Sequence, residues 1–142
     1  MQRPFRSKTR AAALALFLGV LGAHRFYLRG PRDLLGWLHL PLFLAAVWGL
    51  VGVASEGLGG AAASVGIPLA AVCLGLALFQ ALLLGLTPDA RWDARWNAGH
   101  AERSQSGWGA VLVVMFSLLI GTAALAGGLA IALQRMFAAQ GG

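Results

Sequence analysis

Four long apolar runs dominate the chain, separated by short polar connections. They cover Ala11–Leu28, Leu34–Ala54, Ala61–Leu86 and Trp108–Leu133. A membrane-spanning helix needs about 20 mostly apolar residues to cross roughly 30 Å of hydrocarbon. The last three runs meet this length, whereas the uncharged part of the first, Ala11–Ala23, reaches only about 20 Å at the rise of an α-helix. The pattern predicts an all-α polytopic membrane protein: a helical hairpin whose first segment is short, followed by two further transmembrane helices.

Composition leaves no room for a separate soluble domain. Of 142 residues, 58% are hydrophobic and only 11% are charged, whereas soluble domains average about 25% charged residues. The predicted organisation is a basic N-terminus, a hairpin, a third transmembrane helix, a connection with a short interfacial helix, a fourth transmembrane helix and a tail. These segments cover residues 1–10, 11–54, 61–86, 87–107, 108–133 and 134–142.

The formal charge of +6 does not indicate nucleic-acid binding, because the basic residues flank apolar spans instead of forming one folded basic face. A cleaved signal peptide is an alternative for the N-terminus, since a basic segment precedes Ala11–Gly22. Leu21-Gly22-Ala23 is a poor cleavage site, because Leu21 stands where a small residue is required. The single Cys73 excludes an intrachain disulfide.

The distribution of the eleven Lys and Arg residues bears on topology. Four complete crossings would put five on one side and six on the other, which is no bias. If the first run enters the membrane and returns, or lies at the interface, ten share the cytoplasmic side and one lies outside. Cytoplasmic connections are normally the basic ones. Charge and length therefore both favour a non-standard first segment, and both versions place connections 29–33 and 87–107 in the cytoplasm.

The longest connection contains a four-residue repeat. Ala90-Arg91-Trp92-Asp93 is followed by Ala94-Arg95-Trp96-Asn97, and the repeat is predicted to form a short helix with Thr87 as its N-cap and Pro88 at its first position. A spacing of four puts Trp92 and Trp96 on one helix face. We predict that these indoles anchor the helix in the headgroup layer; the alternative is an aromatic platform for a partner.

Small residues recur at intervals of four in three of the runs, and such faces let membrane helices pack closely. Packing within the chain is the simpler expectation, and a homo-oligomer is the alternative. The three sets are Ala11, Ala15, Gly19 and Ala23; Ala77, Ala81 and Gly85; and Ala124, Gly128 and Ala132.

A distinctive motif follows the first apolar stretch. The sequence Gly19-Val20-Leu21-Gly22-Ala23-His24-Arg25-Phe26-Tyr27-Leu28 places two ionisable side chains at membrane depth, where they need pairing, hydration or access to the surface. Together with Ser7-Lys8-Thr9 it resembles the TM2 domain, over about residues 7–54. Gly19, Gly22, His24, Arg25, Phe26 and Tyr27 carry this resemblance.

The resemblance implies two hydrophobic segments around a short turn, in a family whose bacterial members generally have no assigned activity. This sequence departs from the pattern at Arg29, where a glycine is common, and in lacking an acidic residue late in the second helix. The third and fourth runs lie outside the resemblance.

Elementary chemistry gives the motif two interpretations. Arg25 can hold a headgroup phosphate or pair with Asp33, a good N-cap across the turn, while Phe26 and Tyr27 anchor the interface. In the simpler interpretation the motif fixes the geometry and depth of the hairpin. In the other it forms a site for a ligand or partner.

The sequence shows no catalytic constellation and predicts no metal or cofactor site. The spacing of His24, His39, His100, Cys73 and Met115 matches no ligand motif. Few polar residues lie inside the spans, essentially Gln80, Ser117 and Thr122. We predict a small multi-pass protein of the inner (plasma) membrane, acting as a non-enzymatic packing or interaction component in contact with membrane lipids, a membrane protein partner or copies of itself. The alternative is a permeation protein for small solutes or metal ions.

Overall fold

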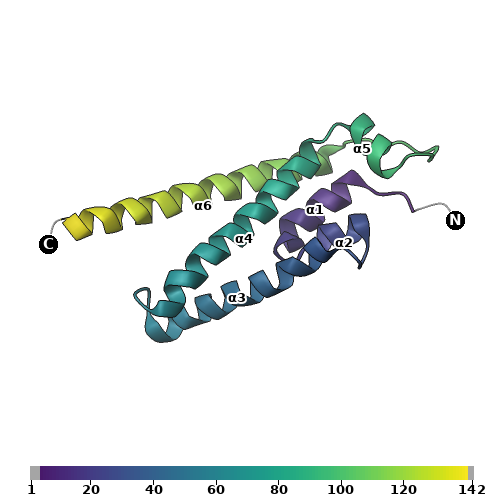
Figure 1. Ribbon diagram of the computed structural model, residues 1–142. Helices are drawn as coiled ribbons and strands as arrows, with labels where there is room; N and C mark the ends of the chain where they lie inside the picture. Colours follow the sequence, from purple (N-terminus) through teal and green to yellow (C-terminus); the bar gives the residue numbers. More distant parts are fainter. Residues whose placement is uncertain (1–3, 141–142) are drawn as a thin grey trace.

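The computed structural model describes residues 4–140 and is helical throughout that range apart from its connections (Figure 1). Its elements in chain order are α1 (Lys8–Leu18), the 3-10 turn η1 (Gly19–Leu21), α2 (Ala23–Arg29), α3 (Leu34–Glu56), α4 (Ala61–Leu86), α5 (Asp89–Trp96) and α6 (Trp108–Gln140).

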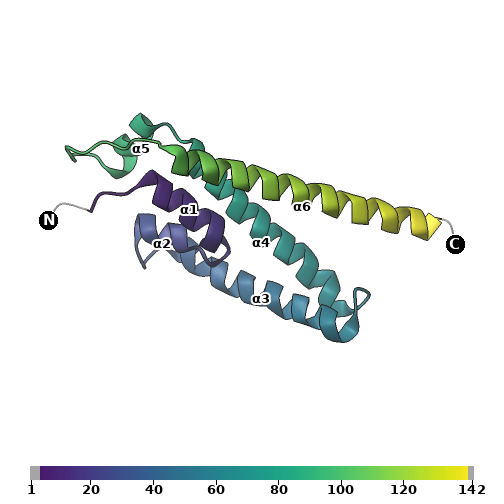
Figure 2. The same ribbon diagram turned by 180° about the vertical axis from the view of Figure 1, so that it is seen from behind.

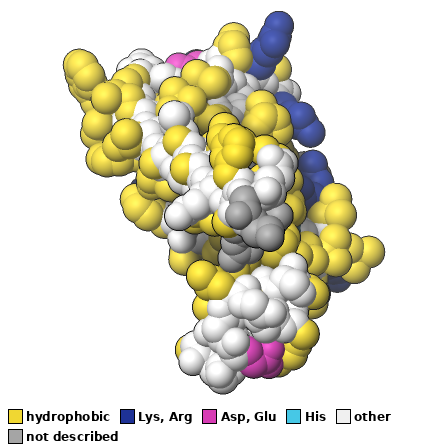
Figure 3. Space-filling model, turned by 90° about the vertical axis from the view of Figure 1, so that its left-hand side faces the viewer, with side chains coloured by type: hydrophobic (Ala, Val, Ile, Leu, Met, Phe, Trp, Pro, Cys, Tyr) yellow, Lys and Arg dark blue, Asp and Glu magenta, His cyan; other side chains and the backbone are white. Residues whose placement is uncertain are grey.

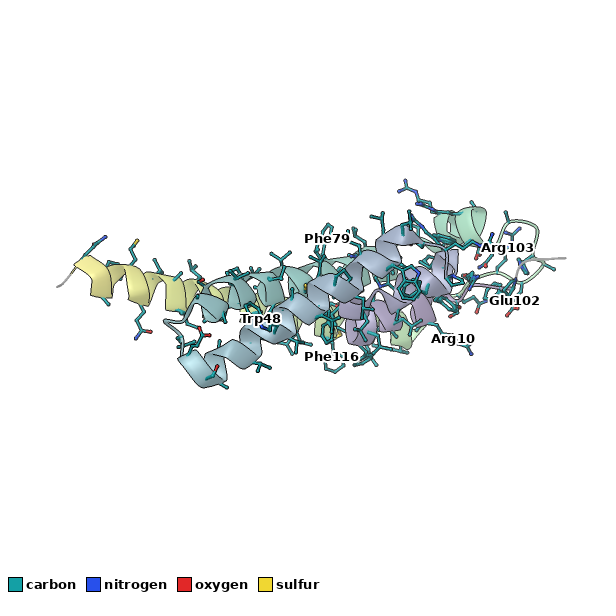
Figure 4. All side chains as sticks on the ribbon, turned by 60° about the horizontal axis from the view of Figure 1, so that its bottom comes forward. Arg10, Trp48, Phe79, Glu102, Arg103 and Phe116 are labelled. Atoms are coloured by element: carbon teal, nitrogen blue, oxygen red, sulfur yellow. The ribbon has the colours of Figure 1, made fainter. Side chains whose placement is uncertain are left out.

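Three of these helices, α3, α4 and α6, are long and apolar enough to cross a membrane. This confirms the all-α polytopic fold class. Large apolar side chains project outward along their length, among them Trp48, Phe79 and Phe116, which are 65%, 57% and 51% exposed (Figure 4). Figure 3 likewise shows hydrophobic side chains over much of one face. Such a surface suits hydrocarbon, which is as apolar as the side chains themselves.

The first apolar segment is not one helix but a tight helix–turn–helix. α1 ends at Leu18, and Gly22 then adopts a left-handed φ of 73°, which favours glycine because other side chains meet steric strain there. α2 runs back beside α1 (Figures 1 and 2). The backbone N of Ser7 accordingly lies 2.9 Å from the hydroxyl oxygen of Tyr27, to which it donates. The first segment therefore returns to the end of the bundle where it began.

Small residues set how closely the long helices approach. A Cβ added to Gly49 in α3 would lie 2.1 Å from the Cα of Gly66 in α4, so the two backbones are in direct contact. α1 packs on α4 in the same manner, because a Cβ on Gly19 would lie 2.8 Å from the Cβ of Ala77. Ala12 and Ala15 are completely buried, in a cluster with Ala81 and Val113. Helix contact through small side chains is the usual solution in lipid.

The predicted small-residue faces differ in burial: most of the first two sets is buried and the third is exposed. Ala11, Ala15 and Gly19 of the first set are buried, as are Ala77 and Ala81 of the second. The third set is exposed, so the expectation of packing within the chain is wrong for Ala124, Gly128 and Ala132. The reason is that α6 packs on α1 and α4 through its first half and then diverges from the bundle (Figure 1).

α6 is also longer than predicted. It continues from Trp108 to Gln140, so residues 134–140 are helical and do not form a separate tail. Nothing in the sequence after Leu133 stops a helix, since neither proline nor glycine occurs before Gly141.

Candidate functional site

The polar segments of the chain meet at one end of the bundle. The N-terminal segment, the α2–α3 turn and the connection between α4 and α6 all lie there, while the α3–α4 turn lies at the far end of α3 (Figures 1 and 2). Arg10, Glu102 and Arg103 mark this polar end in Figure 4. Nine basic residues gather at this end: Arg6, Lys8, Arg10, Arg25, Arg29, Arg32, Arg91, Arg95 and Arg103.

A buried polar network joins the N-terminal segment to the connection. Asn97 is fully buried, and its Oδ1 accepts from the backbone N of Arg6 at 2.8 Å while its Nδ2 donates to the backbone O of Arg6 at 3.2 Å. Asp93 accepts from Asn97 Nδ2 at 2.9 Å, from Ser104 N at 2.8 Å and from Ser104 Oγ at 2.6 Å. Burial raises the pKa of Asp93, but the hydrogen bonds from Ser104 and Asn97 prevail and hold that pKa below its usual value. We call residues 4–7 together with 87–107 the cap.

A second tie holds the start of α1 to the cap. Lys8 is 5% exposed; its Nζ lies 2.5 Å from Oδ1 of Asp89 and donates to the backbone O of Thr87 at 2.8 Å. Asp89 also accepts from the backbone N of Ser106 at 2.8 Å. A buried ammonium thus has both a counter-charge and a carbonyl acceptor, which offsets its desolvation. The sequence offered no signal for this pairing, because Lys8 and Asp89 are far apart along the chain.

The structure corrects the prediction for Trp92. Its indole is only 1% exposed, and Nε1 donates to the backbone O of Arg6 at 2.7 Å, so it packs against the N-terminal segment instead of projecting outward as an anchor. Trp96 lies beside it, with ring centroids 6.0 Å apart, and is partly exposed. The short helix itself is present, although it begins at Asp89, with Pro88 at the N-cap position in place of Thr87.

The motif helix α2 is pressed against the start of α3. A Cβ on Gly22 would lie 2.7 Å from the backbone O of Gly36, and one on Gly36 would lie 2.6 Å from Cε1 of Phe26. Phe26 packs edge-on against Trp37 at 5.2 Å between ring centroids. The Tyr27 hydroxyl is hydrogen-bonded inside the chain by Ser7. Phe26 and Tyr27 therefore fix the hairpin by internal contacts.

Arg25 and Asp33 form a two-pronged ion pair across the turn. Nε of Arg25 lies 2.9 Å from Oδ2 of Asp33, and Nη2 lies 3.4 Å from Oδ1. The side chains are 17% and 9% exposed. Burial raises the pKa of Asp33, yet the hydrogen bond and charge of Arg25 outweigh it and leave that pKa below its usual value. Of the two partners considered for Arg25, the structure shows Asp33. Asp33 occupies the N-cap position of α3, but its side chain pairs with Arg25 and makes no capping hydrogen bond.

His24 is buried at the contact between α2 and α4. Only 3% of it is exposed, and its Nε2 is hydrogen-bonded to Oε1 of Gln80. Nδ1 of His24 and Nε2 of His39 have no hydrogen-bond partner among residues 4–140. The two rings meet edge to face at 6.0 Å between centroids. Within the same residues, no group of three or more His, Cys, Asp or Glu side chains lies close enough to hold a metal ion.

A cavity of about 310 Å³ opens where α2, α4 and α5 meet. Four arginines contribute to its lining, and no carboxylate does. Trp92 and Trp96 form part of its wall, and Arg95 stacks on Trp96 at 5.3 Å from the ring centroid. We call it the basic cavity; it is lined by His24, Arg25, Leu28, Arg29, Gln80, Leu83, Leu84, Thr87, Arg91, Trp92, Arg95 and Trp96.

Comparison with protein families assigns the first part of this arrangement. Residues 4–55 match the model of the TM2 domain, which is three residues more at the N-terminus than the motif resemblance covered. The chain carries a TM2 domain. Neither the curated proteins nor the solved structures gave a match. In structural terms the TM2 domain comprises the returning α1–α2 hairpin and almost all of α3, while α4, α5 and α6 lie outside it.

The ion pair within the TM2 domain leads to a graded prediction. Arg25→Lys cannot reproduce the two-pronged contact and should lower the free energy of unfolding by about 1 kcal/mol. Arg25→Leu leaves the carboxylate of Asp33 with only the longer, 4.0 Å ion pair to Arg29 and should lower the free energy of unfolding by about 1–3 kcal/mol. Thermal and denaturant melts in mild detergent measure both losses.

A double-mutant cycle tests whether Asp33 is the energetically relevant partner. Asp33→Asn should resemble Arg25→Leu, and the double variant should be little worse than either single variant, because all three remove the same contact. Additive losses would contradict the pairing and indicate that each side chain has another partner, a headgroup phosphate in the case of Arg25.

Proposed function

We propose that this protein is a non-enzymatic membrane component that acts by binding through its polar end. The observation that carries the proposal is the basic cavity. Its lining offers guanidinium, indole, imidazole and amide groups, but neither a pair of carboxylates nor a nucleophile next to a base. Such groups bind and position an anionic or aromatic partner. The charged and aromatic lining groups stand on helices of the cap and of the TM2 domain. Buried polar contacts, such as the Trp92–Arg6 hydrogen bond and the Lys8–Asp89 ion pair, join the two parts.

We further propose that the polar end faces the cytoplasm and that the α1–α2 hairpin is re-entrant. The positive-inside rule supports this orientation, because the nine basic residues named above lie at the polar end and the α3–α4 turn, residues 57–60, has none. The contact between Ser7 and Tyr27 supports the hairpin, because both ends of the first segment reach the same level. In a bacterial cell, a multi-pass protein with one end in the cytoplasm lies in the inner (plasma) membrane.

Cysteine labelling in intact cells tests the orientation. In a Cys73→Ser background, Arg10→Cys, Arg32→Cys and Arg103→Cys should all resist a membrane-impermeant maleimide, and Gly59→Cys should react. Labelling of all four sites after the cells are permeabilised is the control for exposure. If position 10 reacts and position 32 does not, the first segment crosses the membrane completely and the hairpin is not re-entrant.

Purification with native lipids tests the binding role. We expect the chain to retain a stoichiometric bound component, and chemical cross-links to form from the cap instead of from the α3–α4 turn. The permeation alternative predicts a different outcome, namely solute or metal-ion flux into liposomes containing only this protein. Such flux, without any bound component, would contradict the proposal.

A further inference from the structure

The basic cavity holds more positive charge than the protein neutralises. Arg25 is paired with Asp33, and Arg29 lies 4.0 Å from the same carboxylate. Arg91 and Arg95 form no ion pair with any residue in the range 4–140, and both are exposed. They stand four residues apart on α5, a spacing at which like charges repel. An anion bound between these two guanidinium groups would neutralise their charge and relieve the repulsion.

We propose that the basic cavity binds a phosphate-bearing anion, supplied either by a lipid headgroup or by free phosphate. Arginine suits this ligand because its planar guanidinium presents parallel N–H groups that match the spacing of two phosphate oxygens. Arg91 and Arg95 of α5 are the principal contacts, and Arg29 of α2 also lines the cavity. The inference rests on the function proposed above, since it names the ligand of the same polar end.

Two further features of the cavity support this assignment. Gln80 lines it together with His24, to which it is hydrogen-bonded through its Oε1, so the lining contains polar groups besides the arginines. Leu28, Leu83 and Leu84 provide the apolar part of the lining. A headgroup with its attached glycerol and acyl carbons would use both kinds of wall, and basic pockets between membrane helices are known headgroup sites.

The place of the cavity on α4 fits a ligand at the membrane surface. Gln80, Leu83, Leu84 and Thr87 occupy the last two turns of α4 and the residue that follows it. In a helix of 26 residues, which exceeds the roughly 20 needed to span, these turns come within reach of the headgroup layer. A lipid headgroup could therefore reach the cavity directly from the membrane surface.

Binding is tested with the full chain purified in an uncharged detergent. The probes are short-chain phosphatidylglycerol, short-chain phosphatidylcholine and inorganic phosphate, with Trp fluorescence and native mass spectrometry as readouts. We expect phosphatidylglycerol to bind and to change Trp fluorescence, and phosphatidylcholine to bind at least about tenfold more weakly, because its ammonium offsets the phosphate charge. Saturable binding of inorganic phosphate that competes with phosphatidylglycerol would identify free phosphate as a source as well.

A matched pair of variants assigns the binding to the cavity. The double variant Arg91→Gln/Arg95→Gln should lose at least about tenfold in affinity for phosphatidylglycerol, the scale of one lost charge-assisted contact. The control Arg10→Gln/Arg32→Gln removes the same charge from two exposed positions at the same end that do not line the cavity. It should change the affinity less than about twofold, since it alters only the long-range field.

A measurement on the unaltered chain avoids dependence on whether the variants fold. Phenylglyoxal modifies exposed arginines, and peptide mapping follows each one separately. Phosphatidylglycerol should protect Arg91 and Arg95 and leave Arg32 reactive. Equal affinities in the two double variants, or no protection of Arg91 and Arg95, would overturn the inference. Neither result depends on membrane orientation or on flux, so the proposed function stands or falls on its own tests.

Discussion

Gly66→Ala is expected to separate α3 from α4, although it adds a single methyl group. The new Cβ would lie 2.2 Å from the Cα of Gly49, 2.5 Å from its carbonyl carbon and 3.0 Å from the backbone N of Leu50. All three atoms belong to a helix backbone, which cannot rotate away as a side chain can. Overpacking of a core ordinarily costs about 1–3 kcal/mol of stability. Here the added methyl group is fixed to the backbone of α4 and meets the backbone of α3, so the loss should reach or exceed about 3 kcal/mol.

The effect is measured as the free energy of unfolding in a mixed-detergent titration followed by circular dichroism. Gly75→Ala in the same helix is the matched control, because nothing lies within 4 Å of a Cβ built there. Gly75→Ala should leave stability unchanged or raise it by up to about 1 kcal/mol, since alanine is the better helix former. Similar losses from the two substitutions would show that helix propensity, and not the crossing of α3 and α4, decides the outcome.

The glycine pair illustrates which part of this fold the sequence could predict. Length and hydropathy depend on the residues of one helix alone, so the three spanning helices could be placed from the sequence. Helix packing depends on which faces meet, and this chain has 20 glycines to choose from. The faces identified by spacing included Gly19 and Gly85, which closely approach Ala77 and Val114, but not Gly49 or Gly66. A crossing point is a property of two helices, and spacing within one does not reveal it.

The motif was more predictable than the cap for a similar reason. Arg25 and Asp33 are eight residues apart around a sharply marked turn, so local sequence already suggested their pairing. Trp92 binds the backbone of Arg6 across 86 positions, and a backbone carbonyl has no signature in the sequence. Two tryptophans on a charged helix resemble an interfacial anchor whichever way they point. The basic cavity was missed because its arginines come from separate segments, α2 and α5.

Asp93→Ala is expected to release the N-terminal segment from the cap while the spanning helices remain folded. Asp93 is 3% exposed and accepts three hydrogen bonds, from Asn97 and from the backbone and side chain of Ser104. Without it Asn97 and Ser104 lose an acceptor that they share, and each donor left unsatisfied costs about 1–3 kcal/mol. Asn97, which holds Arg6 by both its backbone N and O, loses the contact that orients it. We expect faster hydrogen exchange at the Arg6 amide and trypsin cleavage after Arg6, with helical content nearly unchanged.

Two comparisons isolate the carboxylate from the rest of the cap. Glu102→Ala removes an exposed acid from the same connection and should leave both readouts as in the parent. Asp93→Asn keeps the shape but places an amide N–H opposite one of the Ser104 donors, so it should approach Asp93→Ala. If Asp93→Asn exchanges at the parent rate, shape and not acceptor capacity holds the cap together.

The same carboxylate makes cap stability depend on pH. Hydrogen bonds from Ser104 and Asn97 hold the pKa of Asp93 below its usual value despite the opposing effect of burial. A carboxyl group whose pKa is lower in the folded state stabilises that state above its unfolded pKa of about 3.9, and this contribution is lost as the pH falls through the folded value.

Exchange at the Arg6 amide, corrected for its intrinsic pH dependence, should therefore lose protection below about pH 4 in the parent. Asp93→Asn should show a smaller loss, due to Asp89, whose pKa is lowered by Lys8 and Ser106 despite the opposing effect of burial. An equal loss in both proteins would place the titrating group elsewhere and leave Asp93 with a role as a packed acceptor only.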